Sequence, residues 1–294
     1  MSYRLNKVLS LSGSVDVNTS GEELSKLFKE ALDSGMHGLC FSAYFEGQEP
    51  GTELSEAQVR QRMEIIAPYT KWIRSFSCIE GNELIPKVAK EFGIKTLVGA
   101  WLGDDMEKNE EEIEGLLKLA KEGYVDIAAV GNEVLYRKDL TEDQLLDYII
   151  RVKNSIGDVP VGYVDAYYEF EIKPRITEAC DVVLANCYPF WEGCANEYAL
   201  LYMKDMYERT KRAANGKKVI ITETGWPSEG QDLYGAHPSK EGAMRYFINS
   251  QYWSAAEDID IFYFSSFDEA WKTGAEGDVG AYWGLWDKDH NLKF

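Results

Sequence analysis

The sequence predicts an α/β fold, a (β/α)8 barrel in which eight parallel strands alternate with helices, and three observations support this prediction. Apolar runs rich in β-branched residues recur at intervals of about 25 to 40 residues, each followed by a polar turn and an amphipathic stretch. Eight such runs are present. The length of 294 residues suits a barrel of this type, which takes about 250 residues. No linker, low-complexity segment or repeat divides the chain, so we expect a single domain over residues 1–294.

The expected strands are short apolar runs bounded by Gly, Asp or Lys. They cover residues 37–44, 72–77, 95–101, 126–133, 159–167, 181–188, 218–224 and 260–267. Residues 1–35 precede the first strand and contain a helical pattern over 21–35. We expect this N-terminal extension to pack on the barrel, either covering its bottom or supplying the helix that completes the outer ring.

Helical patterns fall between the strands, over residues 56–70, 109–123, 141–157 and 240–258. Ser55, Thr141 and Ser239 stand just before three of them, and each precedes a Glu in the first turn. These hydroxyl residues are expected N-caps.

Composition narrows the choice of partners. The net charge is −19 and Lys and Arg form no cluster, so neither nucleic acid nor an anionic membrane is an expected partner. No apolar run reaches the roughly 18 residues that a membrane span needs. Aromatic residues make up 13% of the chain, including eight Trp and eighteen Tyr, which exceeds what one barrel core uses. A neutral or cationic substrate is more natural for an acidic protein, and some of the aromatic residues are expected to line its site.

The sequence contains no recognisable metal-binding or cofactor-binding motif. The cysteines lack CxxC or Cys/His ligand spacing, so we expect buried, reduced thiols and no metal at Cys40, Cys78, Cys180, Cys187 and Cys194. The three histidines lie far apart, and neither GxSxG nor a Gly-rich phosphate loop is present. No cofactor is expected. The first residues do not form a secretory signal, so we expect an intracellular protein or one whose leader has been removed.

Two expected strands end on a glutamate. The run Val219-Ile220-Ile221 stops at Glu223, and the strand over 126–133 ends with Glu133. Because barrel enzymes place their chemistry at the carboxyl ends of the strands, these carboxylates are expected to converge at the mouth. One protonated acid and one ionised carboxylate are the equipment of glycoside hydrolysis. The alternative is that each Glu is an ordinary strand-end ion-pair partner.

The segments around these glutamates resemble a known family. "VGNEVLYR" (130–137) and "VIITETGWPSEG" (219–230) are similar to the active-site segments of glycoside hydrolase family 17, the retaining β-1,3-glucan-active enzymes with a (β/α)8 barrel. The likeness continues in "SAYFEGQEPG" (42–51), "NCYPFW" (186–191) and "FDEAWKTG" to "YWGLWD" (267–287). The sequence departs from the family pattern at Cys187 and at the Ser-Ala pair before Tyr44, and residues 1–35 have no recognised counterpart.

The resemblance implies that Glu133 is the general acid/base and Glu223 the nucleophile. Arg74 and the Tyr188 hydroxyl would keep Glu223 ionised if they reach it, because a cation and a donor both favour the charged form. Glu133 needs a raised pKa, which flanking aromatic residues and the charge of Glu223 would provide. The Asn132 amide suits a sugar hydroxyl.

Further residues are expected to bind substrate. The resemblance implies that Glu269 and Lys272 support the acid/base and bind sugar hydroxyls, while a surface salt bridge at helical spacing is the alternative. Aromatic faces that we expect to stack on pyranose rings are those of Tyr44, Trp191, Trp271 and Trp283. Four other tryptophans are expected to pack in the core, namely Trp72, Trp101, Trp253 and Trp286. Trp226 is expected to fix the loop after Glu223.

The resemblance thus implies a retaining glycoside hydrolase that acts on β-1,3-glucan through a covalent glycosyl-enzyme. We expect the protein to be a monomer. A glucanosyltransferase would use the same two glutamates with a second glucan as acceptor. A non-catalytic glucan-binding barrel is disfavoured, because it is expected to lack one of the two glutamates. A phosphate-binding barrel would have a Gly-rich turn after its seventh or eighth strand, where "TGWPSEG" and "SSFDEAW" stand instead.

Overall fold

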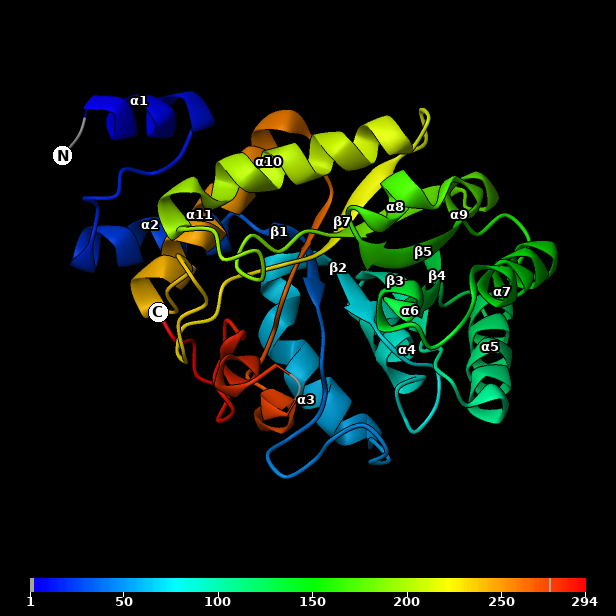
Figure 1. The fold of residues 1–294 in the computed structure, drawn as a ribbon. Helices are drawn as coiled ribbons and strands as arrows, with labels where there is room; N and C mark the ends of the chain where they lie inside the picture. The colour runs from blue at the N-terminus through cyan, green and yellow to red at the C-terminus, as the bar shows by residue number, and fades with distance from the viewer. Residues whose placement is uncertain (1–2, 275) are drawn as a thin grey trace.

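A computed structural model describes residues 3–274 and 276–294. Eight strands form one closed parallel barrel, in which each strand pairs with the next along the chain and β8 pairs with β1 (Figure 1). The strands are β1 Met36–Cys40, β2 Thr70–Ser75, β3 Lys95–Ala100, β4 Ile127–Asn132, β5 Val161–Ala166, β6 Val182–Asn186, β7 Val219–Thr224 and β8 Ile261–Tyr263. The predicted fold class is confirmed, and every strand lies within its expected range or begins at most two residues before it.

The outer layer consists of helices that follow the strands (Figure 1). They are α3 Glu56–Ile66 with the 3-10 turn η1 Ala67–Tyr69, α4 Leu84–Glu91, α5 Met106–Lys121, α6 Val134–Arg137, α7 Glu142–Ser155, α8 Glu169–Ile172, α9 Pro174–Ala179, α10 Asn196–Ala213 and α11 Lys240–Glu257. The 3-10 turns η2 Ala270–Thr273 and η3 Asp278–Tyr282 follow β8. The four helical patterns expected from the sequence correspond to α3 with η1, α5, α7 and α11.

The expected N-caps are present. The Ser55 hydroxyl accepts a hydrogen bond from the Gln58 amide at 3.3 Å, and Thr141 accepts one from Gln144 at 3.3 Å. In both caps the Gln side chain bonds back to the cap backbone, so the reciprocal box closes through Gln and not through the Glu of the first turn. Ser239 caps α11 in the simpler, one-way form.

The N-terminal extension completes the ring of helices. Its second helix, α2 Gly21–Asp33, lies beside α11 (Figure 1). It also contacts η1 at the end of α3, so it takes the position of an outer helix between α11 and α3. Phe28 on α2 packs against Phe247 and Phe294, each with ring centroids 5.0 Å apart. The first helix, α1 Tyr3–Ser12, contacts α10, where Lys204 Nζ donates to the Ser12 carbonyl oxygen at 2.8 Å.

The strand pairing becomes irregular where the polar strand-end residues begin. Pairing of β4 with β5 shifts register between Ala129 and Asn132, and pairing of β6 with β7 shifts between Ala185 and Asn186. After the second shift, Asn186 pairs with Glu223. Such irregularities bend a strand and re-aim its side chains. The barrel wall therefore changes from regular apolar packing to a polar mouth within these residues.

Burial matches the expectation at four of the five cysteines. Four of the cysteines are buried, Cys194 is partly buried, and all five are free. Across residues 3–274 and 276–294, no group of three or more His, Cys, Asp or Glu side chains is placed to hold a metal ion. No helix in these ranges is both long and apolar enough to cross a bilayer.

Candidate active site

The buried carboxylate of Glu223 has two donors. Arg74 on β2 forms an ion pair with its Oε1, and the Tyr188 hydroxyl donates to its Oε2 at 2.7 Å. The Arg74 guanidinium also donates to Asn132 Oδ1 at 2.7 Å and to the Thr222 carbonyl oxygen at 3.2 Å, so it ties β2 to β4 and β7. Both contacts expected for Glu223 are present. A charge at the end of an apolar strand is tolerated here because both of its oxygens are satisfied.

Tyr188 is held in its protonated form. Burial, followed by the nearby charge of Glu223, raises the pKa of its phenol well above the ordinary value. The hydroxyl therefore stays a donor to the Glu223 carboxylate across the whole working pH range.

Glu133 differs from Glu223 in its environment. Burial and then the charge of Glu223 raise the pKa of Glu133 to about 7, and the hydrogen bond from Asn186 opposes this increase. That bond runs from Asn186 Nδ2 to Glu133 Oε1 at 2.9 Å. At neutral pH a large fraction of Glu133 therefore carries a proton. The charge of Glu223 thus acts on Glu133, and a carboxyl group with a raised pKa beside a second carboxylate is an arrangement suited to acid/base chemistry.

The backbone at Glu133 has a left-handed conformation. Its φ is +52°, and it stands between the end of β4 and the short helix α6. Non-glycine residues adopt this conformation at a cost, and such outliers gather at functional sites. The Glu133 amide donates to the Val164 carbonyl oxygen at 2.8 Å, which fixes the turn.

A group of residues that sequence reasoning left without a role positions Glu133. Asn186 accepts from Thr222 Oγ1 at 3.0 Å, so its amide orientation is defined. The Tyr163 hydroxyl accepts from the Leu135 amide at 2.9 Å and donates to Asp165. Asp165 ends a predicted strand, but no local pattern indicates that it would support the segment after Glu133 from the neighbouring strand.

Glu269 and Lys272 form a buried pair and not a surface salt bridge. Lys272 Nζ lies 2.8 Å from Glu269 Oε2, and the two side chains are 12% and 5% exposed. Trp271 Nε1 donates to Glu269 Oε1 at 3.1 Å. Glu276 was missed by sequence reasoning. Burial raises its pKa to about 7, with Lys272 opposing, and the charges of Glu269 and Glu223 add to the increase.

Not all of the aromatic residues expected to stack on sugar rings are accessible. Tyr44 and Trp271 meet edge to face with centroids 6.2 Å apart, and Trp191 is 39% exposed. Trp283 is only 3% exposed and packs on Tyr188, so its ring forms part of the wall and offers little surface to a sugar.

The prediction that Trp101 packs in the core is wrong. Trp101 is 39% exposed because it is the first residue past β3, on the loop at the mouth, and the Arg137 guanidinium lies 4.6 Å from its ring centroid. The other tryptophans that were assigned to the core are buried or partly buried, namely Trp72, Trp253 and Trp286. Trp226 is buried and donates from Nε1 to the His237 carbonyl oxygen at 3.1 Å, so it does fix the loop after Glu223.

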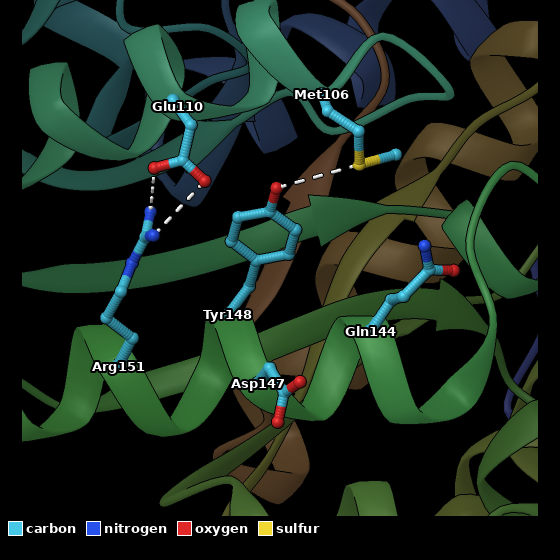
Figure 2. A pocket seen from close by; sticks show the side chains of 6 residues that line it. All are labelled: Met106, Glu110, Gln144, Asp147, Tyr148 and Arg151. Atoms are coloured by element: carbon cyan, nitrogen blue, oxygen red, sulfur yellow. Dashed lines mark hydrogen bonds and ion pairs between the residues drawn. The ribbon is translucent and has the colours of Figure 1, made fainter.

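A groove on the outer wall lies apart from these residues. Figure 2 shows its lining between α5 and α7, where Arg151 pairs with Glu110 and the Tyr148 hydroxyl contacts Met106 Sδ at 3.9 Å. These groups partner one another, and none belongs to the mouth of the barrel.

Comparison with known proteins identifies the family. Residues 38–284 match the model of the BtgE/BtgC glycoside hydrolase domain. The crystal structure of a glycoside hydrolase family 17 β-1,3-glucanosyltransferase from Rhizomucor miehei superposes with a TM-score of 0.80 at 27% identity, covering 89% of this chain and 96% of that one. The chain belongs to glycoside hydrolase family 17.

Two further similar proteins are glucan 1,3-β-glucosidases. A glucan 1,3-β-glucosidase of Candida albicans is 30% identical over 79% of this chain and 83% of its own length. One from Saccharomyces cerevisiae is 28% identical over 83% of this chain and 86% of its own length. The match to the family model begins at residue 38, within β1, so α1 and α2 precede the residues that this model covers.

Proposed function

We propose that this protein is a retaining glycoside hydrolase that acts on β-1,3-glucan, with Glu223 as nucleophile and Glu133 as general acid/base. The observation that carries the proposal is the contrast between two neighbouring carboxyl groups. Arg74 and Tyr188 hold Glu223, while burial raises the pKa of Glu133 to about 7. Family membership and the names of the relatives, a β-1,3-glucanosyltransferase and glucan 1,3-β-glucosidases, support the choice of substrate.

In the first step, a Glu223 oxygen attacks the anomeric carbon and forms an ester bond. The bond from that carbon to the glycosidic oxygen breaks, and the proton of Glu133 goes to the departing oxygen. The charge of Glu223 is consumed in the ester. The repulsion that helped to raise the pKa of Glu133 then disappears, so this pKa falls. A larger fraction of Glu133 is therefore ionised in the second step, where it acts as a base.

In the second step, Glu133 removes a proton from the acceptor, whose oxygen attacks the anomeric carbon and releases Glu223. Water as acceptor gives hydrolysis, and a sugar hydroxyl gives transfer. The transferase is a second candidate because the structurally similar Rhizomucor miehei enzyme is a glucanosyltransferase.

The surrounding residues are proposed to bind the sugar at the reacting carbon. Asn132 accepts from Arg74 with its Oδ1, which leaves its Nδ2 to donate to a sugar hydroxyl. The buried pair of Glu269 and Lys272 can hydrogen-bond further hydroxyls, because a carboxylate accepts and an ammonium donates. Tyr44, Trp191 and Trp271 are proposed as stacking faces, and Trp283 packs against Trp191.

Products from a defined β-1,3-linked oligosaccharide test the proposed reaction. Chromatography over time, at low and high substrate concentration, is expected to show cleavage of the chain, and purely shorter products would indicate water as acceptor. Products longer than the starting oligosaccharide at millimolar substrate would establish transfer. Cleavage of only some other β-linked glycan would overturn the linkage, and no cleavage of any glycan would overturn the proposal.

Asn186→Ala tests how Glu133 is tuned. The Asn186 amide stabilises the charged form of Glu133, so removing it is expected to raise the pKa of Glu133 further. The acid form then persists to higher pH, and the alkaline limb of the kcat/KM profile is expected to move upward. A pH titration of kcat/KM measures this. An unchanged limb with only a lower plateau would assign Asn186 a structural role instead.

A further inference from the structure

An unusual tyrosine stands at the tip of the loop between β7 and α11. Tyr234 is 88% exposed and has a φ of +51°. It lies in a two-residue turn closed by Leu233 and Ala236, whose amides and carbonyl oxygens exchange hydrogen bonds of 2.9 Å each. Gly or Asn is the natural residue for a left-handed position in a turn, and a large exposed ring adds no buried surface there. The fold alone gives no reason for a tyrosine at this position.

The ring of Tyr234 nevertheless has a defined neighbour. It lies on Gly193 in the loop after β6, so closely that a Cβ at Gly193 would come within 2.8 Å of the ring. Next to it, the Gly235 amide donates to the Gly193 carbonyl oxygen at 3.1 Å. The loops after β6 and β7 are therefore tied together, and Tyr234 is presented on a defined support at the mouth of the barrel.

Aromatic contacts connect this rim to the candidate nucleophile. Trp191 stands two residues before Gly193 and is 39% exposed, and its ring centroid lies 5.5 Å from that of Trp283. Trp283 in turn lies 5.4 Å from Tyr188, whose hydroxyl donates to Glu223. An aromatic wall thus runs outward from Glu223 to Trp191, and Tyr234 lies against Gly193, two residues further along the same loop.

We infer that Tyr234 forms an outer sugar-binding subsite that makes the enzyme favour longer β-glucan chains, an inference that rests on the proposed function. Sugar C–H faces pack on exposed aromatic planes, and hydrogen bonds hold the turn that carries this ring before substrate binds. The neighbouring Asp232 and His237, paired at 2.9 Å and both more than 60% exposed, offer polar groups for the hydroxyls at the edge of that sugar. Because the aromatic path from Glu223 ends at Trp191, on the loop that also carries Gly193, the occupant of this position is the glucan chain and not another protein.

The test compares the wild type with Tyr234→Asn on a short and on a long substrate. Asparagine accepts the left-handed backbone, so the turn is preserved and the melting temperature is expected to stay the same or rise. The kcat/KM for laminariheptaose is expected to fall about three- to tenfold, as the loss of one stacking contact implies, while that for laminaritriose stays unchanged. Tyr234→Trp keeps an aromatic ring at this position and is therefore expected to keep the wild-type preference for the longer chain.

Tyr252→Ala is the matched control, because Tyr252 is 43% exposed but lies on α11 and not at the mouth. It should leave the ratio of the two kcat/KM values unchanged. An equal loss on both substrates, or no loss on either, would overturn the outer subsite. So would a change of oligomeric state in Tyr234→Asn without a change in the ratio. If the wild type cleaves neither oligosaccharide, the proposed function fails. Calorimetric binding of laminariheptaose then tests the subsite by itself. Equal affinity of wild type and Tyr234→Asn would overturn the subsite, and weaker binding by the variant would support it.

Discussion

Glu223→Gln is expected to lose nearly all turnover, about a thousandfold or more in kcat, while oligosaccharide binding stays close to that of the wild type. The amide has the shape of the carboxylate and still accepts a hydrogen bond from Tyr188, but it cannot form the glycosyl ester. Steady-state kinetics measures the turnover, and calorimetry with the same oligosaccharide measures the binding. Retention of more than about a tenth of the wild-type kcat would remove Glu223 from the mechanism.

The control for this variant must separate catalysis from stability. Glu223→Gln leaves the buried Arg74 without its counter-ion, so the melting temperature is expected to fall. Asp260→Asn removes a carboxylate paired with His37 and Lys218 just before β8, at the end of the barrel opposite the mouth. It is expected to lower stability and to leave kcat unchanged. A similar loss of kcat in both variants would mean that Glu223 acts only through the fold.

The strands could be predicted because their physical signal is local. A parallel strand buried on both faces needs a run of apolar, β-branched residues, and β7 shows this in Val219-Ile220-Ile221. The same reasoning located the two glutamates, since a charge at the end of such a run demands a partner. Arg74 provides that partner from β2, far away in the sequence and close in the barrel.

The side chains of the loops could not be predicted in the same way. Trp101 is exposed and Trp283 is buried, and the difference depends on where each loop turns after the strands and not on the residues around them. Glu276 and Tyr234 show the same limit, because their surroundings come from segments distant in the sequence. The position of α2 was likewise one of two alternatives, which only the packing of Phe28 against α11 decides.

Glu133→Gln is expected to slow cleavage of natural glucan oligosaccharides by about a hundred- to ten-thousandfold, because the departing sugar then leaves without a proton. The loss is expected to be much smaller in the first step with a dinitrophenyl glycoside, since dinitrophenolate is stable as an anion. The second step still lacks its base, so the glycosyl-enzyme should accumulate. Stopped-flow absorbance is expected to show a burst of dinitrophenolate equal to the enzyme concentration, followed by slow turnover that azide accelerates. Equal losses on both substrates, without a burst, would contradict the role of Glu133.

The pH dependence gives the same assignment an independent check. The first step needs protonated Glu133, whose pKa burial and the charge of Glu223 raise to about 7. In the wild type, kcat/KM for a natural oligosaccharide is therefore expected to be high below that pH and to decline as the pH rises through about 7 and the proton is lost. In Glu133→Gln this decline should disappear, because an amide does not titrate in this range. A decline that persists unchanged in the variant would belong to another group, and Glu276, whose pKa is also raised to about 7 beside Lys272, would be the group to replace next.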